Sequence, residues 1–411
     1  MEQNDLSLSR PSTLHYSSEI HPYVSEFFNF CRLKKMHNMA QNKKIRVGIT
    51  HGDINGIGYE VIMKALEDPL MTDLCTPIVY GSSKALSYHR KALEMGNVNF
   101  TLVPRAEDAA DGVNNLVEVV DGEVRIELGS PSEAAGKAAL AALKRAADDL
   151  RNGIIDVMVT APINKDSIQG DDFHFPGHTE FLESRIGEGN KALMILFDDH
   201  LRVALVTTHL PLAQVPEAIT KDAIVEKLEI FNDSLKKDFD IIKPRIAVLS
   251  LNPHAGENGM LGTEEKEVIT PAIEEAYSRK IMAFGPYAAD GFFGSGQYTH
   301  FDGVLAMYHD QGLAPFKTIA MDDGVNFTAG LPYVRTSPDH GTGYDIAGKN
   351  QASEASLRSA IFKAIDIFRN RTRFYEMNAH PLRRQYYDKS GDKEVLDLTK
   401  DDDESSEILN A

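Results

Sequence analysis

Three histidines in the middle of the chain each follow a short apolar run, and together they have the residue type for metal chemistry. His209 follows the run 203–208, His254 follows 246–253 and His309 follows 304–308. Short aliphatic runs bounded by turn formers predict buried strands of a largely parallel sheet. Because the ligand crevice of such a sheet lies beyond the carboxyl ends of its strands, three imidazoles there would converge on one point. They predict a catalytic divalent metal with an open position for substrate or water. The alternative is three crevice histidines that are hydrogen-bonded within the protein.

A glycine-containing turn follows the first expected strand, 45–50, and runs from Gly52 to Gly58. Glycines at a strand-to-helix turn allow a ligand to approach the backbone closely, and the N-terminus of the next helix favours anions. The spacing differs from the G-x-G-x-x-G pattern of Rossmann domains. We therefore expect a ligand loop of another type, and the alternative is a tight turn that needs positive φ.

Two further segments offer donors to an anion. Lys165 follows a strand expected at 155–160, where the lysine either binds phosphate or is solvated. His178 and Thr179 stand at the start of a short predicted helix, where side-chain and backbone donors favour a negatively charged ligand.

Composition excludes several classes of function. The net charge is −18 and no basic stretch offsets it, which argues against nucleic-acid binding. No run approaches the ~20 apolar residues of a membrane span, and the N-terminus lacks a signal-peptide pattern. Cys31 and Cys75 have no metal or redox spacing. We expect a cytoplasmic protein with no nucleic-acid and no membrane partner.

The order of the predicted elements indicates an α/β fold of two α/β/α domains that share a mixed, largely parallel sheet. One domain combines 44–160 with 310–375 and would hold the cofactor; the other spans 161–309 and would hold the metal, the substrate and the dimer contacts. Residues 1–43 form an extension that we expect to be disordered, and 376–411 form an acidic tail. Hairpins are expected for 193–197 with 201–207 and for 116–120 with 124–128, and a strand pair is expected for 324–328 with 331–336.

Eight blocks of sequence occur in order between residues 45 and 368. They are GDINGIG at 52–58, FPGHTEF at 175–181, THLPL at 208–212, LNPHAGE at 251–257, MYHDQG at 307–312, GVN at 324–326, LPYVRT at 331–336 and DHGT at 339–342. Together they closely resemble the 4-hydroxythreonine-4-phosphate dehydrogenase family of pyridoxine biosynthesis. The loop at 339–348 is also similar to the adenosine-binding loop of isocitrate and isopropylmalate dehydrogenases, which implies their fold and NAD binding without a Rossmann domain.

The resemblance implies NAD(P)-dependent oxidation and decarboxylation of 4-phosphooxy-L-threonine to 3-amino-2-oxopropyl phosphate. It also implies a divalent metal (Zn, Mg or Co) and a homodimer with the active site at the interface. The implied metal ligands are His209, His254 and His309. The implied substrate-binding residues are His178, Thr179, Lys317, Asn326 and Arg335. The implied cofactor-binding residues are Gly56, Gly58, His340, Gly341 and Asp345. Lys317 is the candidate base, or else pairs with substrate anions, and Asp310 would orient the metal site.

The first loop departs from the family, which usually has Pro-Ala before Gly-Ile-Gly and Pro after it. The extension and the acidic tail have no counterpart in the family pattern. Two other functions remain open at this point. One is a sister dehydrogenase that acts on a phosphorylated sugar acid, such as 4-phospho-erythronate or threonate. The other is a metal-dependent hydrolase of phosphorylated small molecules, which needs no nicotinamide.

Overall fold

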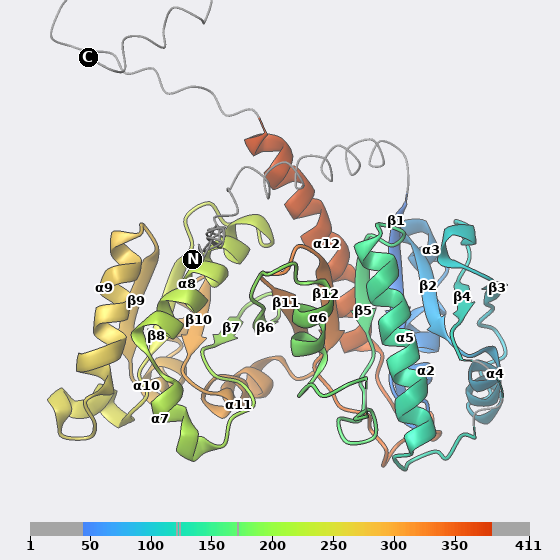
Figure 1. The fold of residues 1–411 in the computed structure, drawn as a ribbon, viewed down its shortest axis with the longest axis horizontal. Helices are drawn as coiled ribbons and strands as arrows, with labels where there is room; N and C mark the ends of the chain where they lie inside the picture. Colours follow the sequence, from blue (N-terminus) through green and yellow to red (C-terminus); the bar gives the residue numbers. More distant parts are fainter. Residues whose placement is uncertain (1–43, 121, 123–124, 171, 380–411) are drawn as a thin grey trace, which may run out of the picture. The chain divides into compact units, whose positions relative to one another are not determined.

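The computed structural model describes residues 44–120, 122, 125–170 and 172–379 (Figure 1). The chain divides into two compact units, residues 1–374 and 375–411, and the sheet belongs to the first. The predicted extension 1–43 and the part of the predicted tail from 380 onward lie outside the described residues.

A twelve-stranded sheet forms the centre of the first unit. Its strands are β1 (Ile45–Thr50), β2 (Cys75–Gly81), β3 (Thr101–Val103), β4 (Asn115–Glu118), β5 (Val157–Thr160), β6 (Leu193–Phe197), β7 (Arg202–Leu205), β8 (Arg245–Leu249), β9 (Met282–Tyr287), β10 (Gly303–Ala306), β11 (Val325–Ala329) and β12 (Val334–Pro338). Their order in the sheet is β3-β4-β2-β1-β5-β12-β11-β6-β7-β10-β8-β9. The pairs β11–β12, β11–β6 and β6–β7 are antiparallel and the other pairs described are parallel. The predicted mixed, largely parallel sheet is confirmed.

Helices cover both faces of the sheet. They are α2 (Gly58–Ala65), α3 (Leu70–Leu74), α4 (Ser83–Ala92), α5 (Glu133–Arg151), α6 (His178–Ile186), α7 (Val215–Ala218), α8 (Lys221–Lys237), α9 (Thr270–Ser278), α10 (Ala289–Gly294), α11 (His309–Ala320) and α12 (Ala355–Asn378). Short 3₁₀ turns lie at Ala106–Asp108, Leu212–Gln214, Pro253–Gly259 and Gln297–His300, and a π-helical turn lies at Glu265–Ile269. None of the described helices is both long enough and apolar enough to span a bilayer.

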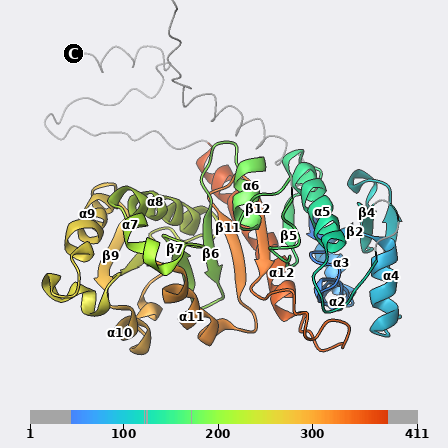
Figure 2. The ribbon, with the colours of Figure 1, turned by 60° about the horizontal axis from the view of Figure 1, so that its bottom comes forward.

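The two-residue period of the strands divides the core between the two faces. Ile246 and Val248 of β8 lie in the same buried cluster as residues of α8 and α9, whereas Ala247 and Leu249 cluster with residues of α10 and α11. Figure 2 shows the corresponding arrangement, with α8 and α9 on one side of these strands and α10 and α11 on the other. Helices therefore cover both faces of the sheet at β8, which accounts for the continuous apolar run in that strand.

The predicted pairs 193–197 with 201–207 and 324–328 with 331–336 are confirmed as β6–β7 and β11–β12. The predicted hairpin of 116–120 with 124–128 is wrong in its described part, because β4 lies in parallel between β2 and β3 and residues 125–128 form no strand. Asn55 explains the difference. Its Oδ1 accepts from the backbone N–H of Glu127 (2.8 Å), and its carbonyl accepts from that of Gly129 (2.9 Å). These two N–H groups therefore bind the loop that follows β1 and not a neighbouring strand.

The sheet is continuous across the two predicted domains. The strands from β3 to β11 in the spatial order come from 44–160 and 310–375, and those from β6 to β9 come from 161–309. The division into a cofactor domain and a metal domain stays a prediction.

Candidate active site

The three histidines proposed as metal ligands follow three neighbouring strands. β10 pairs in parallel with β7 on one side and with β8 on the other, so the three carboxyl ends lie at one edge of the sheet. His209 comes after β7, His254 after β8, and His309 after β10 as the first residue of α11. The three predicted strands are confirmed, and they bring the three segments to the same edge.

Two of the three imidazoles lie close together. The ring centroids of His209 and His309 are 6.1 Å apart, whereas His254 is exposed on the turn Pro253–Gly259. Within the described part of one chain, no three side chains of His, Cys, Asp or Glu are grouped so that they could hold a metal ion. The three-histidine metal site stays a prediction.

Carboxylates lie beside the Nδ1 atoms of the two neighbouring imidazoles. Glu180 Oε1 is 3.4 Å from His209 Nδ1, and Asp310 Oδ1 is 2.7 Å from His309 Nδ1. A carboxylate at one ring nitrogen orients the ring and leaves the other nitrogen for a metal. Lys165 Nζ lies 3.2 Å from that other nitrogen, Nε2, of His209. Imidazole donors with this support fit a divalent cation such as Zn²⁺ or Co²⁺.

The backbone around His254 is left-handed. Five successive residues have positive φ, namely His254 (52°), Ala255 (51°), Gly256 (77°), Glu257 (42°) and Asn258 (57°). This conformation is unfavourable for residues with a Cβ atom, so surrounding contacts must determine it. Glu265 supplies some of them, because its Oε1 accepts from the backbone N–H groups of Leu251 (2.8 Å) and Asn252 (2.7 Å).

Arg335 is a buried cation at the centre of the sheet. It lies on β12, and its guanidinium donates to Thr160 Oγ1 on β5 (2.6 and 3.1 Å) and to Thr328 Oγ1 on β11 (3.1 Å). In the part of the chain that the structure describes, no carboxylate lies at ion-pair distance from it. Burial lowers the pKa of Arg335 to about 9, against a smaller opposing effect of Glu180. A buried guanidinium held only by neutral hydroxyls is suited to an anionic ligand.

The N-terminus of α6 lies in the same electrostatic neighbourhood. The helix begins at His178 and Thr179, and its N-cap residue, Gly177, has no side chain to cap the first N–H groups, whereas the Glu180 carboxylate accepts from its own backbone N–H. The Nε2 atom of His178 is buried, with no hydrogen-bond partner among the described residues. Burial, and then the charges of Arg335 and Lys165, hold the pKa of His178 well below its usual value. The first N–H groups of a helix close to a buried cation are suited to an anionic ligand.

Lys317 lies on α11, the helix that begins at His309. Its Nζ lies 3.2 Å from Asp339 Oδ1 and donates to the Asp339 carbonyl (3.1 Å). Burial raises the pKa of Asp339, and Lys317 and His309 oppose that effect. The Oδ1 atom of Asn326 on β11 is buried, with no hydrogen-bond partner among the described residues. Asn326 lies opposite Ser337 of β12, two residues from Arg335, and Lys317 and His309 both act on the Asp339 carboxyl group.

The two glycine loops proposed for the cofactor lie against each other. Ile57 N donates to the Thr342 carbonyl (2.9 Å), and Tyr344 Oη donates to Asp53 Oδ2 (2.8 Å). A Cβ atom at Gly56 would come within 2.5 Å of the Thr342 carbonyl oxygen, and one at Gly58 within 2.1 Å of that of His51. Close packing inside the protein thus accounts for both glycines.

The second loop is the more open of the two. Gly341 has open space where a Cβ atom would stand, and Asp345 is exposed, with only its carbonyl engaged by Lys349 (2.6 Å). His340 is half-buried; its Nδ1 lies 3.0 Å from the Gly341 carbonyl and its Nε2 has no partner within the described chain. These three residues can face a cofactor, and that assignment stays a prediction.

Four residues of the site were not predicted from the sequence, namely Thr160, Glu180, Thr328 and Asp339. Lys165 was predicted either to bind phosphate or to be solvated. Lys165 and Asp339 follow the carboxyl ends of β5 and β12, so their position at a strand end was the available signal. The two threonines carry no such signal, because their contact with Arg335 depends on which strands neighbour β12.

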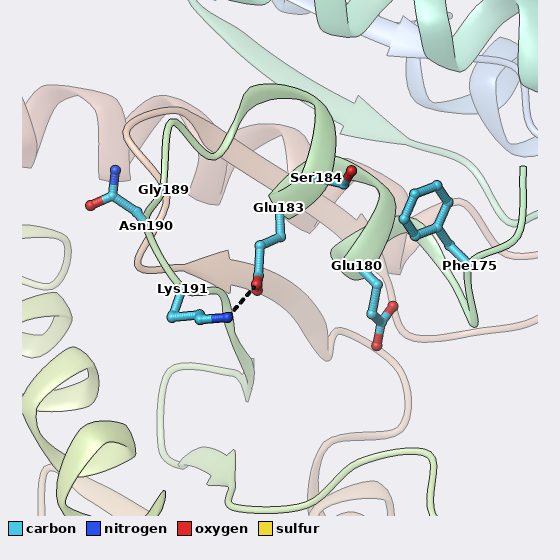
Figure 3. Close-up of a pocket in the computed structure, with 7 residues that line it drawn as sticks. All are labelled: Phe175, Glu180, Glu183, Ser184, Gly189, Asn190 and Lys191. Carbon is cyan, nitrogen blue, oxygen red and sulfur yellow. Dashed lines mark hydrogen bonds and ion pairs between the residues drawn. The ribbon is translucent and has the colours of Figure 1, made fainter. Parts of the chain in front are cut away.

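A pocket of about 360 Å³ runs along α6, lined by Phe175, Glu180, Glu183, Ser184, Gly189, Asn190 and Lys191 (Figure 3). Glu183 and Lys191 point toward each other and pair at 3.4 Å, while the carboxylate of Glu180 points away from them. Glu180 is the one lining residue that also contacts a predicted ligand, His209. The pocket therefore adjoins the candidate site, but none of the site residues predicted from the sequence lines it.

Comparisons with known proteins agree on one family. The family described as pyridoxal phosphate biosynthetic protein PdxA matches residues 73–364. A 4-hydroxythreonine-4-phosphate dehydrogenase from Bacteroides thetaiotaomicron is 60% identical over 364 residues, which cover 88% of this chain and 100% of that protein. A crystal structure of 4-hydroxythreonine-4-phosphate dehydrogenase from Klebsiella pneumoniae has a TM-score of 0.68 and 31% identity, covering 79% of this chain and 100% of its own.

A more distant likeness is to a terephthalate 1,2-cis-dihydrodiol dehydrogenase from Burkholderia xenovorans, with a TM-score of 0.53 and 25% identity, covering 78% of this chain and 98% of the other. These relatives are dehydrogenases, so the predicted class of oxidoreductase is confirmed and the hydrolase alternative is dropped. The resemblance found in the sequence blocks is confirmed as well. The chain belongs to the family of the pyridoxal phosphate biosynthetic protein PdxA.

Proposed function

We propose that this oxidoreductase uses NAD⁺ or NADP⁺ to oxidise the secondary alcohol of 4-phosphooxy-L-threonine. The alcohol carbon loses hydride to the nicotinamide and the hydroxyl loses its proton. The resulting β-keto acid loses carbon dioxide and takes up a proton at the carbon that carried it, which gives 3-amino-2-oxopropyl phosphate; the reduced cofactor is NADH or NADPH. Support comes from the name of the 60% identical relative and from the chemistry of the site.

The observation that carries the proposal is the buried guanidinium of Arg335, whose charge acts on His178 at the start of α6. A phosphate or carboxylate supplies the negative charge that Arg335 lacks, and a planar guanidinium can bind it through two parallel hydrogen bonds. The Thr179 hydroxyl and the imidazole of His178, whose Nε2 is buried, are the further donors that we assign to that anion. We assign the substrate phosphate to this place.

Lys317 and Asp339 form the proposed acid–base pair. In its charged form, Lys317 is held by Asp339 and orients an anionic group of the substrate. In its neutral form it accepts the hydroxyl proton during oxidation. The raised pKa of Asp339 allows that carboxyl group to take up a proton in turn.

We propose His209, His254 and His309 as ligands of one divalent cation, with Glu180 and Asp310 orienting two of the rings. The cation supplies positive charge that stabilises negative charge developing on oxygen. Because one chain brings only two of the rings close together, the proposal includes a homodimer in which a second copy completes the site. A cytoplasmic location is part of the same proposal.

We place the nicotinamide cofactor along the loop with His340, Gly341 and Asp345, next to the turn that contains Gly56 and Gly58. The cofactor accepts the hydride, and the protein provides its binding and orientation. The open side of Gly341 and the exposed carboxylate of Asp345 are the features that support this assignment.

The alternative substrate is a phosphorylated sugar acid, which differs by the absence of an amine. The likeness to a dehydrogenase of another substrate, at a TM-score of 0.53, favours keeping it. Purified enzyme with Zn²⁺ and NAD⁺ should release NADH and carbon dioxide in equal amounts from 4-phosphooxy-L-threonine. Faster turnover of 4-phospho-D-erythronate would establish the alternative, and NADH release without carbon dioxide would contradict the decarboxylation step.

A further inference from the structure

A chain of hydrogen bonds joins the ends of the three strands that precede the three histidines. Thr207 Oγ1 donates to the Met307 carbonyl (2.8 Å), Met307 N donates to Gln311 Oε1 (2.7 Å), and Gln311 Nε2 donates to the Ser250 carbonyl (2.6 Å). We call these four residues the strand-end brace. Thr207, Met307 and Ser250 are buried, so the brace lies beneath the exposed edge that carries the histidines.

Each branch of the brace stands a few residues before one proposed ligand. Thr207 precedes His209 by two residues and Met307 precedes His309 by two. Ser250 precedes His254 and begins the segment that leads into the left-handed turn. The brace therefore links the three histidine segments beyond the ends of their strands.

Gln311 is the central member of the brace. It is the third residue of α11, and its bond from Met307 N resembles the way an N3 side chain reaches back at a helix start. Its second bond, to Ser250, contributes nothing to that helix, because Ser250 belongs to the segment after β8. The amide side chain is needed because one group must accept and one must donate.

The His254 branch needs such a support more than the other two. Its left-handed backbone includes four residues with a Cβ atom, and local preference does not favour that conformation. Glu265 fixes Leu251 and Asn252 from one side, and Gln311 fixes Ser250 from the other. The Ser250 hydroxyl also donates to the Asn252 carbonyl (2.9 Å), which joins the two supports.

We infer that Gln311 and Thr207 are positioning residues for the metal site, because they fix the segments that present His209, His254 and His309 at the edge of each chain. This inference rests on the proposed function, which makes these histidines the ligands. Neither residue touches the cation or the substrate. Outer residues that orient metal ligands typically change metal affinity by about 10- to 100-fold when they are removed.

The test is a Co²⁺ titration of metal-free protein, followed by the visible absorption of the bound ion and by equilibrium dialysis. Gln311→Met removes both bonds of the central amide, and Thr207→Val removes one hydroxyl bond without a change of size. Each should weaken Co²⁺ binding by about 10-fold or more. Thr336→Val is the matched control, since it removes a buried hydroxyl-to-carbonyl bond to Ala360 outside the brace and should leave Co²⁺ affinity unchanged.

Circular dichroism and thermal melting show which variants keep the fold, and Thr207→Val serves where Gln311→Met unfolds. Folded variants that bind Co²⁺ as tightly as the wild type overturn the inference and leave the proposed metal site intact. A wild-type chain that binds no Co²⁺ overturns both. Equal weakening in Thr336→Val shows general loosening of the fold and also overturns the inference.

Discussion

The candidate site has two regions that are built differently. The first, which we call the anion cluster, consists of Thr160, His178, Thr328 and Arg335. The second, which we call the histidine edge, consists of His209, His254 and His309. Thr160, Thr328 and Arg335 lie within neighbouring strands, where the sheet ladder fixes them. The members of the histidine edge lie beyond their strands, on a turn, a loop and a helix start.

Burial follows the same division. Arg335 is 3% exposed, whereas the side chains of His209 and His309 are 32% and 40% exposed. All members of the anion cluster come from one chain, and the buried charge of Arg335 has no carboxylate partner there among the described residues. The histidine edge depends on the brace beneath it and on what approaches it from outside. Sheet register thus preorganises the anion cluster. The histidine edge is left to be completed, in our proposal, by a second copy of the chain and a cation.

The largest expected effect concerns Arg335. Arg335→Met should lower kcat/KM by about 1000-fold, because a buried charged contact to substrate is lost. The melting temperature should stay the same or rise, because the variant removes a desolvated cation that has no carboxylate partner among the described residues. Steady-state kinetics and thermal melting measure the two quantities on the same protein.

Arg371 is the matched control for that variant. It is also buried, at 5% exposed, but it is paired with Asp238. Arg371→Met should destabilise the fold by about 3–5 kcal/mol, because it leaves a buried carboxylate uncompensated. An Arg335→Met protein that unfolds as readily as Arg371→Met would show that Arg335 serves the fold and would remove the distinction between the regions.

A second prediction uses the buried imidazole of the anion cluster. The pKa of His178 is well below its usual value of 6.5 because of burial and the charges of Arg335 and Lys165. As the pH falls below 6.5, the unfolded chain therefore binds a proton at this site before the folded chain does, and the free energy of unfolding decreases. His178→Asn should make that acid-side decrease shallower, as measured by urea unfolding between pH 7 and 5.

Asn326→Leu is the control for this experiment, because it removes a buried polar group near the same cluster without removing a titrating one. It should shift the whole curve of stability against pH and keep its slope. An unchanged slope in His178→Asn would mean that this histidine is not held neutral in the folded protein.

Lys165 connects the two regions, and a moderate effect is expected from it. Its Nζ lies 3.2 Å from His209 Nε2, and its charge acts on His178. Lys165→Met should raise KM for the phosphorylated substrate by about 10-fold and weaken its dependence on salt. Lys191→Met is the control, because that lysine pairs with Glu183 away from the histidines. Equal changes of KM in the two variants would show that Lys165 contributes only to the general surface charge.

The smallest expected effect is at Asp310. This carboxylate contacts His309 Nδ1 at 2.7 Å, but its side chain is 84% exposed. Solvent screens such a contact, so Asp310→Asn should weaken Co²⁺ binding by only about 2- to 5-fold and leave the melting temperature unchanged. Glu180→Gln, at the less exposed carboxylate of His209, should have the larger effect. The reverse order would contradict the link between burial and support of the imidazole rings.

The sequence was sufficient for features that rest on local patterns. Apolar runs predicted β7, β8 and β10, and the expected pairing of 193–197 with 201–207 is the observed pair β6–β7. The hairpin after β4 was predicted wrongly, because the decisive contact, from Glu127 to Asn55, joins residues far apart in the chain. Alternating hydrophobicity alone does not indicate which partner a backbone donor will find.

The same limit applies to the site. Histidine at a strand end is visible in a sequence, and so is a block that matches a family. The role of Thr160 depends on β5 lying beside β12, with Met158 opposite Arg335, and no local pattern encodes that register. Gln311 stands inside a predicted block, yet its bond to Ser250 becomes evident only when β8 and β10 are neighbours.

The most direct test of the account is to count the metal ions that the wild-type chain and His254→Ala bind. We predict that wild-type protein dialysed against Co²⁺ retains one ion per chain with the visible spectrum of imidazole ligation. His254→Ala should retain none and lose NADH formation while its circular dichroism is unchanged. Full Co²⁺ retention in His254→Ala, or undiminished turnover after complete removal of metal, would contradict the claim that the three histidines hold one catalytic cation.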